Sequence, residues 1–226
     1  MKKIIGFYNY TVILTYLSLI SAIYAMIFSI GEHYWPAIAC VGLSGLFDMF
    51  DGKVARSKKN RTDSEKMFGI QLDSLCDLVA FGAAPVVLCY NMGMDDFIEM
   101  AVLLFYCICG VIRIAYFNTL EIEDFYANTS AEKVYHGLPI TSIAIILPIV
   151  FLTNFFVASA IVYKAILTAI MFITGVLFIM DFTFKKPNNR FLICTVSIVT
   201  IVIILALYLG PTYIRPGEWD LTRFNW

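Results

Sequence analysis

Apolar residues along the chain gather in blocks of about 20, and short polar joints separate these blocks. A helix of about 20 residues crosses the ~30 Å hydrocarbon core of a bilayer, so each block predicts a membrane-spanning helix. Gly31 and Pro36 mark the first joint, and "NMGMDD" at 91–96 marks a later one. We therefore expect an all-α, polytopic transmembrane bundle that forms a single domain over residues 1–226. About seven spans are expected, at residues 9–30, 34–57, 69–90, 96–119, 138–156, 159–182 and 190–210.

Composition supports a membrane protein, because 60% of the residues are hydrophobic and only 15% are charged. A soluble domain is usually about a quarter charged. The formal net charge is −1, and the chain has no basic domain of the kind that binds nucleic acid. The six cysteines lie within apolar segments and lack the paired spacing of a zinc site, so we interpret them as small buried hydrophobes.

Basic residues gather at alternate joints of the predicted bundle, and such joints face the cytoplasm. The N-terminus is therefore expected inside the cell, and residues 210–226 are expected to form a peripheral tail outside it. An eighth helix, either interfacial or re-entrant, would change the side of the membrane on which the tail is expected. The basic residues of these joints are Lys2, Lys3, Arg56, Lys58, Lys59, Arg61, Lys66, Lys133, Lys185, Lys186 and Arg190.

Two consecutive spans each carry two carboxylates on one helix face. Asp48 and Asp51 are three residues apart in the second span, and Asp73 and Asp77 are four apart in the third. Residues three or four apart share a face of an α-helix. Small residues lie on the same two stripes, namely Gly52, Ala55 and Gly69.

The depths of these carboxylates predict that they converge. At 1.5 Å per residue, Asp48 lies about 13 Å below the cytoplasmic end of its span, and Asp77 lies about 12 Å below. Four carboxylates in one cavity stay ionised only when cations neutralise them. An all-oxygen ligand set favours Mg²⁺ or Mn²⁺ over zinc, and a pair of such ions suits phosphoryl chemistry. Arg56 and Lys53 add positive charge at the mouth for phosphate oxygens.

The two stripes, "DMFDGKVAR" at 48–56 and "GIQLDSLCD" at 69–77, together resemble a family signature. This signature, D-x2-D-G-x2-A-R-x8-G-x3-D-x3-D, is that of the CDP-alcohol phosphotransferases. Every fixed position is present, but the spacer before the second glycine, "SKKNRTDSEKMF", has twelve residues instead of eight. The resemblance implies a core of six transmembrane helices, a homodimer, and transfer of a phosphate-containing group from a CDP-linked donor to a hydroxyl, with release of CMP.

The resemblance also implies roles for individual residues. Two divalent cations, Mg²⁺ or Mn²⁺, would be held by the four carboxylates, and Asp77 would in addition take the proton from the attacking hydroxyl. Gly52, Ala55 and Gly69 would shape the CDP pocket, and Arg56 would serve the phosphates. Asn9 and Thr15, near the cytoplasmic end of the first span, are also expected at the nucleotide pocket, although Asn9 could equally cap the helix.

Two later stretches concern the acceptor, "IRIAYFNT" at 112–119 and "YHGLPIT" at 135–141. Together they resemble paired features of the bacterial and archaeal phosphatidylserine synthases of this family. The resemblance implies that Arg113 and Asn118 bind the serine carboxylate and amine, or the diphosphate, with Gly137 close by. Tyr116 stands where many relatives have a second arginine. The expected substrates are CDP-diacylglycerol and L-serine, and the expected location is a prokaryotic cytoplasmic membrane with the active site facing the cytoplasm.

Other readings stay open. A sibling transferase would use glycerol 3-phosphate, inositol, inositol phosphate or choline, because the catalytic motif is the same for all of these acceptors. Arg113 could also be a helix-end arginine whose charge reaches toward water, and Gly137 could belong to a helix start. A divalent-cation transporter would need access from both faces. The carboxylates lie toward the cytoplasmic half with no matching outer site, which favours an enzyme.

Overall fold

The computed structural model describes residues 5–58, 60–127, 135–154, 157, 159–184, 200 and 204. The predicted span at 190–210 and the tail at 210–226 lie almost entirely outside these residues, as do Lys2, Lys3, Lys59, Lys133, Lys185, Lys186 and Arg190. The helices are α1 (Ile13–Ile30), α2 (Tyr34–Ser57), α3 (Asp63–Asp77), α4 (Ala84–Asn91), α5 (Phe97–Ala127), α6 (Ile143–Thr153) and α7 (Ala160–Ile179). Short helical turns precede α1 and α6, at Tyr10–Val12 and Ile140–Ser142.

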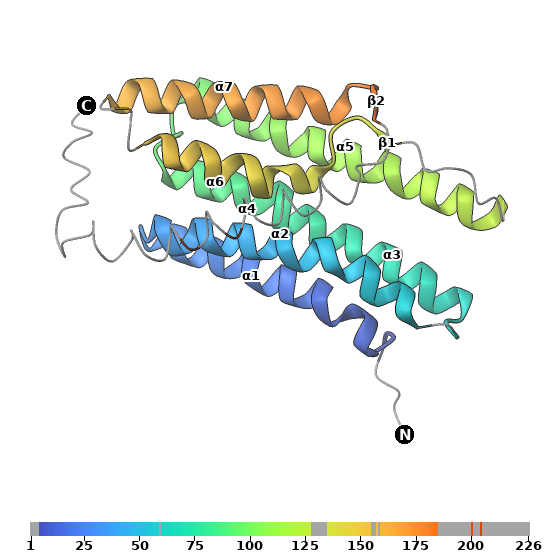
Figure 1. Ribbon diagram of the computed structural model, residues 1–226. Helices are drawn as coiled ribbons and strands as arrows, with labels where there is room; N and C mark the ends of the chain where they lie inside the picture. The colour runs from blue at the N-terminus through green and yellow to red at the C-terminus, as the bar shows by residue number, and fades with distance from the viewer. Residues whose placement is uncertain are drawn as a thin grey trace.

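The helices run side by side in a bundle (Figure 1). Helix α1 packs along α2, and α5 packs along α7. The carboxyl-terminal ends of α2 and α5 and the amino-terminal end of α3 lie at the same end of the bundle. A pair of two-residue antiparallel strands, β1 (Tyr135–His136) and β2 (Thr183–Phe184), joins the segment before α6 to the segment after α7.

Four helices in the described part are long and apolar enough to cross a membrane, namely Tyr10–Ile30, Asp63–Asn91, Phe97–Glu123 and Ala160–Ile179. Apolar side chains on α5 face outward, including Leu104 at 64% exposure and Ile108 at 58%. Helix α2 is not among the four, although its 24 residues measure about 36 Å. The protein is a polytopic helical membrane protein, as the apolar blocks predict.

The two largest departures from the predicted boundaries are the start of α3 and the end of α5. Helix α3 begins at Asp63, not at 69, because Thr62 and Glu65 form a capping box. The Thr62 side chain accepts from the Glu65 amide at 3.2 Å, and the Glu65 carboxylate accepts from the Thr62 amide at 2.9 Å. Helix α5 continues past the predicted end at 119 to Ala127, since no glycine or proline interrupts it there. Because α3 begins at Asp63, the second half of the spacer between the two motif stripes, residues 57–68, is helical.

A π-helical segment, Leu78–Ala83, follows Asp77 directly and joins α3 to α4. Such a turn disturbs the regular hydrogen-bond ladder and is frequently found at functional sites. From α5, the Tyr106 hydroxyl donates to the Phe81 carbonyl oxygen at 2.6 Å, and both side chains are fully buried. The segment is thus tied to the neighbouring helix one turn beyond the acidic stripe.

Small polar side chains join α1 to α2. Ser18 donates to the Ser44 carbonyl oxygen, and Ser44 donates to the Ser18 carbonyl oxygen, each at 3.0 Å. Further along, Ser21 donates to the Cys40 carbonyl oxygen at 2.8 Å. Small residues let membrane helices approach closely, and hydrogen bonds between helices fix their register. The register of α2, which carries two of the aspartates, is therefore fixed against α1.

Candidate active site

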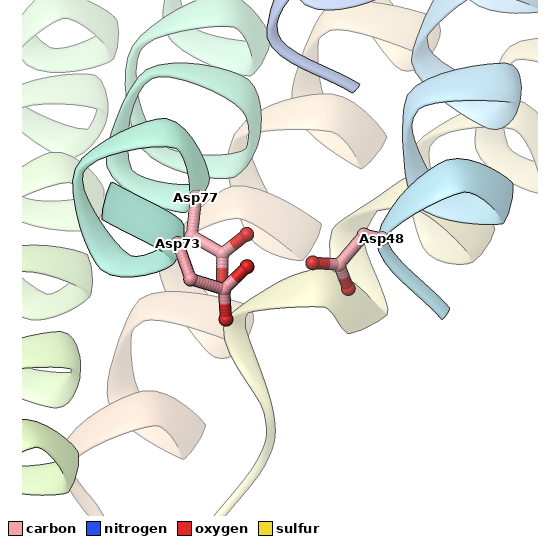
Figure 2. Close-up of side chains that lie close together, drawn as sticks. All are labelled: Asp48, Asp73 and Asp77. Carbon is pink, nitrogen blue, oxygen red and sulfur yellow. The ribbon is translucent and has the colours of Figure 1, made fainter. Parts of the chain in front are cut away.

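Three aspartates from two helices point toward one another (Figure 2). Asp48 comes from α2, while Asp73 and Asp77 lie one turn apart on α3. One carboxylate oxygen from each of them lies within 4.8 Å of the others. The antiparallel course of α2 and α3 brings the two stripes to the same depth, which is the arrangement that their spacing predicts.

Asp51 lies beside this cluster and is held by α1. The Thr15 hydroxyl donates to Asp51 Oδ2 at 3.1 Å, and both residues are buried, with 6% and 7% exposure. The Asp51 carboxyl also lies within hydrogen-bonding range of the Asp73 carboxyl. The positive charge of Arg56 attracts the Asp51 carboxylate. Thr15, which we expected at the nucleotide pocket, therefore contacts one of the predicted cation ligands.

The acidic cluster fits divalent cations. Asp73 Oδ1 is buried and has no hydrogen-bond donor among the described residues. A buried acceptor without a donor is costly, and a bound cation removes that cost. The candidate metal ligands are all carboxylate oxygens, which Mg²⁺ and Mn²⁺ prefer, whereas zinc sites usually contain histidine or cysteine.

The small residues of the motif lie under guanidinium groups. A Cβ atom on Gly52 would lie 3.7 Å from Arg56 Nη1, so the Arg56 side chain folds back along α2 toward Asp51. A Cβ atom on Gly69 would lie 2.5 Å from Arg61 Nη2, a distance that real Cβ atoms do not tolerate. A side chain at Gly69 would therefore require Arg61 to move, whereas a Cβ atom at Gly52 would be in ordinary van der Waals contact with Arg56.

Arg61 is a residue of the site region that we expected only as a loop charge. Its Nη1 donates to the Ala55 carbonyl oxygen at 3.5 Å, and its Nη2 donates to the Glu65 carbonyl oxygen at 3.1 Å. It therefore links the end of α2 to the start of α3. No spacing signal in the sequence marks this contact, because Arg61 lies within the variable spacer.

Asn9 acts as a helix cap in this structure. Its Oδ1 accepts from the Thr11 amide at 3.0 Å, and its Nδ2 lies 3.5 Å from Glu65 Oε1. Lys58 Nζ donates to the same Glu65 oxygen at 2.9 Å. Glu65, in the first turn of α3, thus contacts both the residue before the first helical turn and the residue after α2. A nucleotide contact by Asn9 stays a prediction.

The predicted acceptor residues Arg113 and Gly137 contact each other. Arg113 is 5% exposed, its Nη2 donates to the Gly137 carbonyl oxygen at 3.1 Å, and its guanidinium carbon lies 3.8 Å from the Phe117 ring centroid. Gly137 has φ +64, and a Cβ atom there would lie 2.6 Å from the Met180 carbonyl oxygen. Only glycine fits this position.

The other two predicted acceptor residues differ in their surroundings. Asn118 on α5 is joined to Ser74 on α3, with Ser74 Oγ 2.5 Å from Asn118 Oδ1. The Tyr116 side chain is 48% exposed, and its ring contacts that of Phe117 edge to face. Asn118 thus lies next to the acidic stripe through Ser74, the residue that follows Asp73.

A helical membrane protein with a partly buried carboxylate cluster shared by two helices is suited to bind divalent cations and a charged group at the membrane surface. Residues 8–210 match the CDP-alcohol phosphatidyltransferase family, and the chain belongs to that family. The resemblance of the acidic motif is therefore confirmed.

Curated relatives share about 30% of their residues with this chain. Archaetidylserine synthase of Methanothermobacter thermautotrophicus is 31% identical over 176 residues, which is 77% of this chain and 71% of that protein. The CDP-diacylglycerol–serine O-phosphatidyltransferase of Methanocaldococcus jannaschii is 29% identical over 194 residues, 85% of this chain and 80% of that protein. The enzyme of the same name from Helicobacter pylori is 30% identical over 206 residues, 90% of this chain and 79% of that protein.

Proposed function

We propose that the protein transfers the phosphatidyl group of CDP-diacylglycerol to the hydroxyl of L-serine, giving phosphatidylserine and CMP. The observation that carries the proposal is the convergence of Asp48, Asp73 and Asp77 within 4.8 Å in a chain of the CDP-alcohol phosphatidyltransferase family. The acceptor follows from relatives named for serine or archaetidylserine transfer. These relatives match most of the chain, including the stretches at 112–119 and 135–141.

The donor would lie with its acyl chains in the bilayer and its CDP group over the motif. Gly52, Ala55 and Gly69 would line the nucleotide pocket, where the Arg56 and Arg61 guanidinium groups lie against the two glycines, and Arg56 would supply donors for the phosphates. Two Mg²⁺ or Mn²⁺ ions, when held by Asp48, Asp51, Asp73 and Asp77, would neutralise the diphosphate and the charge that develops on the leaving CMP. Thr15 keeps Asp51 in place by its hydrogen bond.

The acceptor hydroxyl attacks the phosphorus that carries diacylglycerol. The new P–O bond forms as the bond to the CMP oxygen breaks, and the hydroxyl proton passes to a carboxylate. Asp77 is our candidate for this base, because it lies deepest on the α3 stripe. Arg113 keeps further N–H donors besides the one on Gly137, and a guanidinium binds a carboxylate such as that of serine through two parallel hydrogen bonds.

The site is proposed to face the cytoplasm of a prokaryotic cell, at the cytoplasmic membrane. Arg56, Lys58, Arg61 and Lys66 lie at the end of the bundle where α2 ends and α3 begins, which agrees with the positive-inside rule. A homodimer follows from the family resemblance alone and stays a prediction.

The test is CMP release by detergent-purified protein supplied with CDP-diacylglycerol and Mn²⁺ or Mg²⁺. L-serine, glycerol 3-phosphate, inositol, inositol phosphate and choline would be compared in parallel. We expect release with serine only, and none after EDTA. Release with another alcohol would keep the carboxylate chemistry but refute the acceptor. Metal flux in proteoliposomes without CMP release would instead support a divalent-cation transporter.

A further inference from the structure

Arg61 differs from its basic neighbours in the spacer between α2 and α3, because it has no carboxylate partner in the described part of the chain. Lys58 Nζ lies 2.9 Å from Glu65 Oε1, and Lys66 Nζ lies 3.2 Å from Asp63 Oδ1. Arg61 forms no such ion pair with the residues that the structure describes. Among these residues, no contacting carboxylate therefore balances its positive charge.

The guanidinium of Arg61 lies over a glycine of the acidic motif. A Cβ atom on Gly69 would lie 2.5 Å from Arg61 Nη2, so the guanidinium lies in the space that a side chain at this position would take. Gly69 precedes Asp73 by one turn on the same stripe of α3, which is about 6 Å along the helix axis. The unbalanced charge is thus one helical turn from a predicted cation ligand.

Backbone carbonyl oxygens hold this guanidinium but use only part of its hydrogen-bonding capacity. Nη2 donates to the Glu65 carbonyl oxygen at 3.1 Å, and Nη1 donates to the Ala55 carbonyl oxygen at 3.5 Å. Arg61 Nε is buried and has no acceptor among the described residues, which costs free energy. Because the bond to Ala55 is long and therefore weak, the guanidinium can turn to a better acceptor at little cost.

A phosphate group is the acceptor that fits this guanidinium best. Arginine binds phosphate through two parallel, charge-assisted hydrogen bonds, which would also give the Nε–H an acceptor. In the proposed function, the diphosphate of the donor lies at the cations of the acidic stripe, and the nucleotide lies along the small residues of the motif. A guanidinium over Gly69 lies beside that path, as Arg56 does over Gly52.

We propose that Arg61 is a second phosphate-binding arginine of the donor site, and that its guanidinium turns from the Ala55 carbonyl oxygen to the diphosphate of the CDP group. The family signature fixes no residue in this spacer, so the assignment comes from the contacts of Arg61 alone. The inference rests on the proposed function for the identity of the donor, but it does not depend on the acceptor.

The first test measures nucleotide binding without turnover. CDP would be titrated calorimetrically onto detergent-purified, Mn²⁺-loaded wild-type protein and Arg61→Gln, in the absence of any acceptor. We expect CDP to bind about tenfold more weakly to Arg61→Gln, as the loss of a hydrogen bond from a charged group predicts. The affinity for Mn²⁺, titrated without nucleotide, should stay within about threefold, because Arg61 contacts no carboxylate of the cluster in the structure.

Two further variants make this result specific. Arg61→Lys keeps the positive charge and should recover CDP affinity to within about threefold of wild type, since lysine also binds phosphate. Lys66→Gln is the matched control, because it removes one positive charge from the same spacer at an exposed ion pair, and it should leave CDP affinity unchanged. Equal CDP affinities for Arg61→Gln and Lys66→Gln would overturn the proposal.

A purely structural role would give a different set of results, because Arg61 also joins the end of α2 to the start of α3. Loss of this link would disturb the acidic cluster that both helices share. Arg61→Gln would then lose Mn²⁺ and CDP affinity together, and Arg61→Lys would not restore either. That pattern would also overturn phosphate binding by Arg61.

A phosphorylated acceptor is the other source of a phosphate at this position. The KM for CDP-diacylglycerol and the KM for the acceptor would therefore be measured separately. We expect Arg61→Gln to raise the KM for the lipid donor by about tenfold and to leave the KM for the acceptor within about twofold. A raised KM for glycerol 3-phosphate or inositol phosphate, with an unchanged KM for the donor, would overturn the donor assignment.

Failure of the proposed function can be distinguished from failure of this inference. Wild-type protein that releases CMP with an alcohol other than serine would refute the acceptor, while CDP binding would still test Arg61. Wild-type protein that binds no CDP would refute the donor, and the role of Arg61 with it. Wild-type protein that binds CDP and uses serine, with no loss of CDP affinity in Arg61→Gln, would refute the inference alone.

Discussion

The hydroxyl of Tyr106 should be worth more to the protein than that of Tyr163, although both tyrosines are buried in the same bundle. Tyr106 is fully buried, and its hydroxyl donates to the Phe81 carbonyl oxygen at 2.6 Å. Tyr163 is 4% exposed, and its hydroxyl has no partner among the residues that the structure describes. Replacing each tyrosine by phenylalanine removes only the hydroxyl.

The expected magnitude follows from what each hydroxyl leaves behind. Tyr106→Phe leaves the Phe81 carbonyl oxygen of the π-helical segment buried without its donor, which costs about 1–3 kcal/mol. A change of 1 kcal/mol shifts the melting temperature of a protein of this size by about 2–4 °C. We therefore expect a loss of roughly 2–12 °C for Tyr106→Phe. Tyr163→Phe removes an unpartnered polar group and should be neutral or slightly stabilising.

The assay is thermal unfolding of both variants in the same detergent, followed by CMP release well below the melting temperature. Because the π-helical segment begins right after Asp77, Tyr106→Phe should also lower kcat, whereas Tyr163→Phe should not. Equal melting temperatures for the two variants would refute the reasoning, since it depends on the Phe81 carbonyl being the group that loses its partner.

Three further predictions concern the site itself. Asp73→Asn and Asp77→Asn should each abolish CMP release while the protein still inserts and folds, as judged by gel filtration; wild-type turnover in either variant would refute the mechanism. Thr15→Val should weaken Mn²⁺ activation by about 10-fold or more, because it removes the donor to Asp51, and Thr15→Ser should restore it; equal activation curves would contradict a positioning role. Gly137→Ala should lower both stability and activity, because Gly137 has a positive φ and the added Cβ would lie 2.6 Å from the Met180 carbonyl oxygen. An unchanged melting curve would show that alanine fits this position without backbone strain.

The acidic cluster was predictable because it depends only on helix periodicity and antiparallel packing. Asp48 and Asp51, three residues apart, share one face of α2, and Asp73 and Asp77, four residues apart, share one face of α3. A short connection between consecutive spans forces them to run in opposite directions. Once both helices are assumed, the depth of each carboxylate follows from the helical rise.

The boundaries and the cross-helix contacts were not predictable in the same way. The start of α3 at Asp63 depends on the capping box of Thr62 and Glu65, whose "TDSE" signature lies in a spacer that we interpreted as a loop. The bond from Tyr106 to Phe81 and the contact of Ser74 with Asn118 join residues 25 and 44 positions apart. No periodicity relates such pairs, because they arise only when α3 and the π-helical segment after it pack against α5.

The packing of α1 explains how α2 can carry two aspartates within an apolar bundle. A charged side chain inside a membrane protein is stable only when it faces the protein interior and finds partners there. Asp51 is 7% exposed and accepts from Thr15 of α1, while the reciprocal bonds of Ser18 and Ser44 fix the register of the two helices one turn away. The hydroxyl groups of α1 thus direct Asp51 toward Asp73, so that a helix without any acidic residue helps to define the geometry of the acidic site.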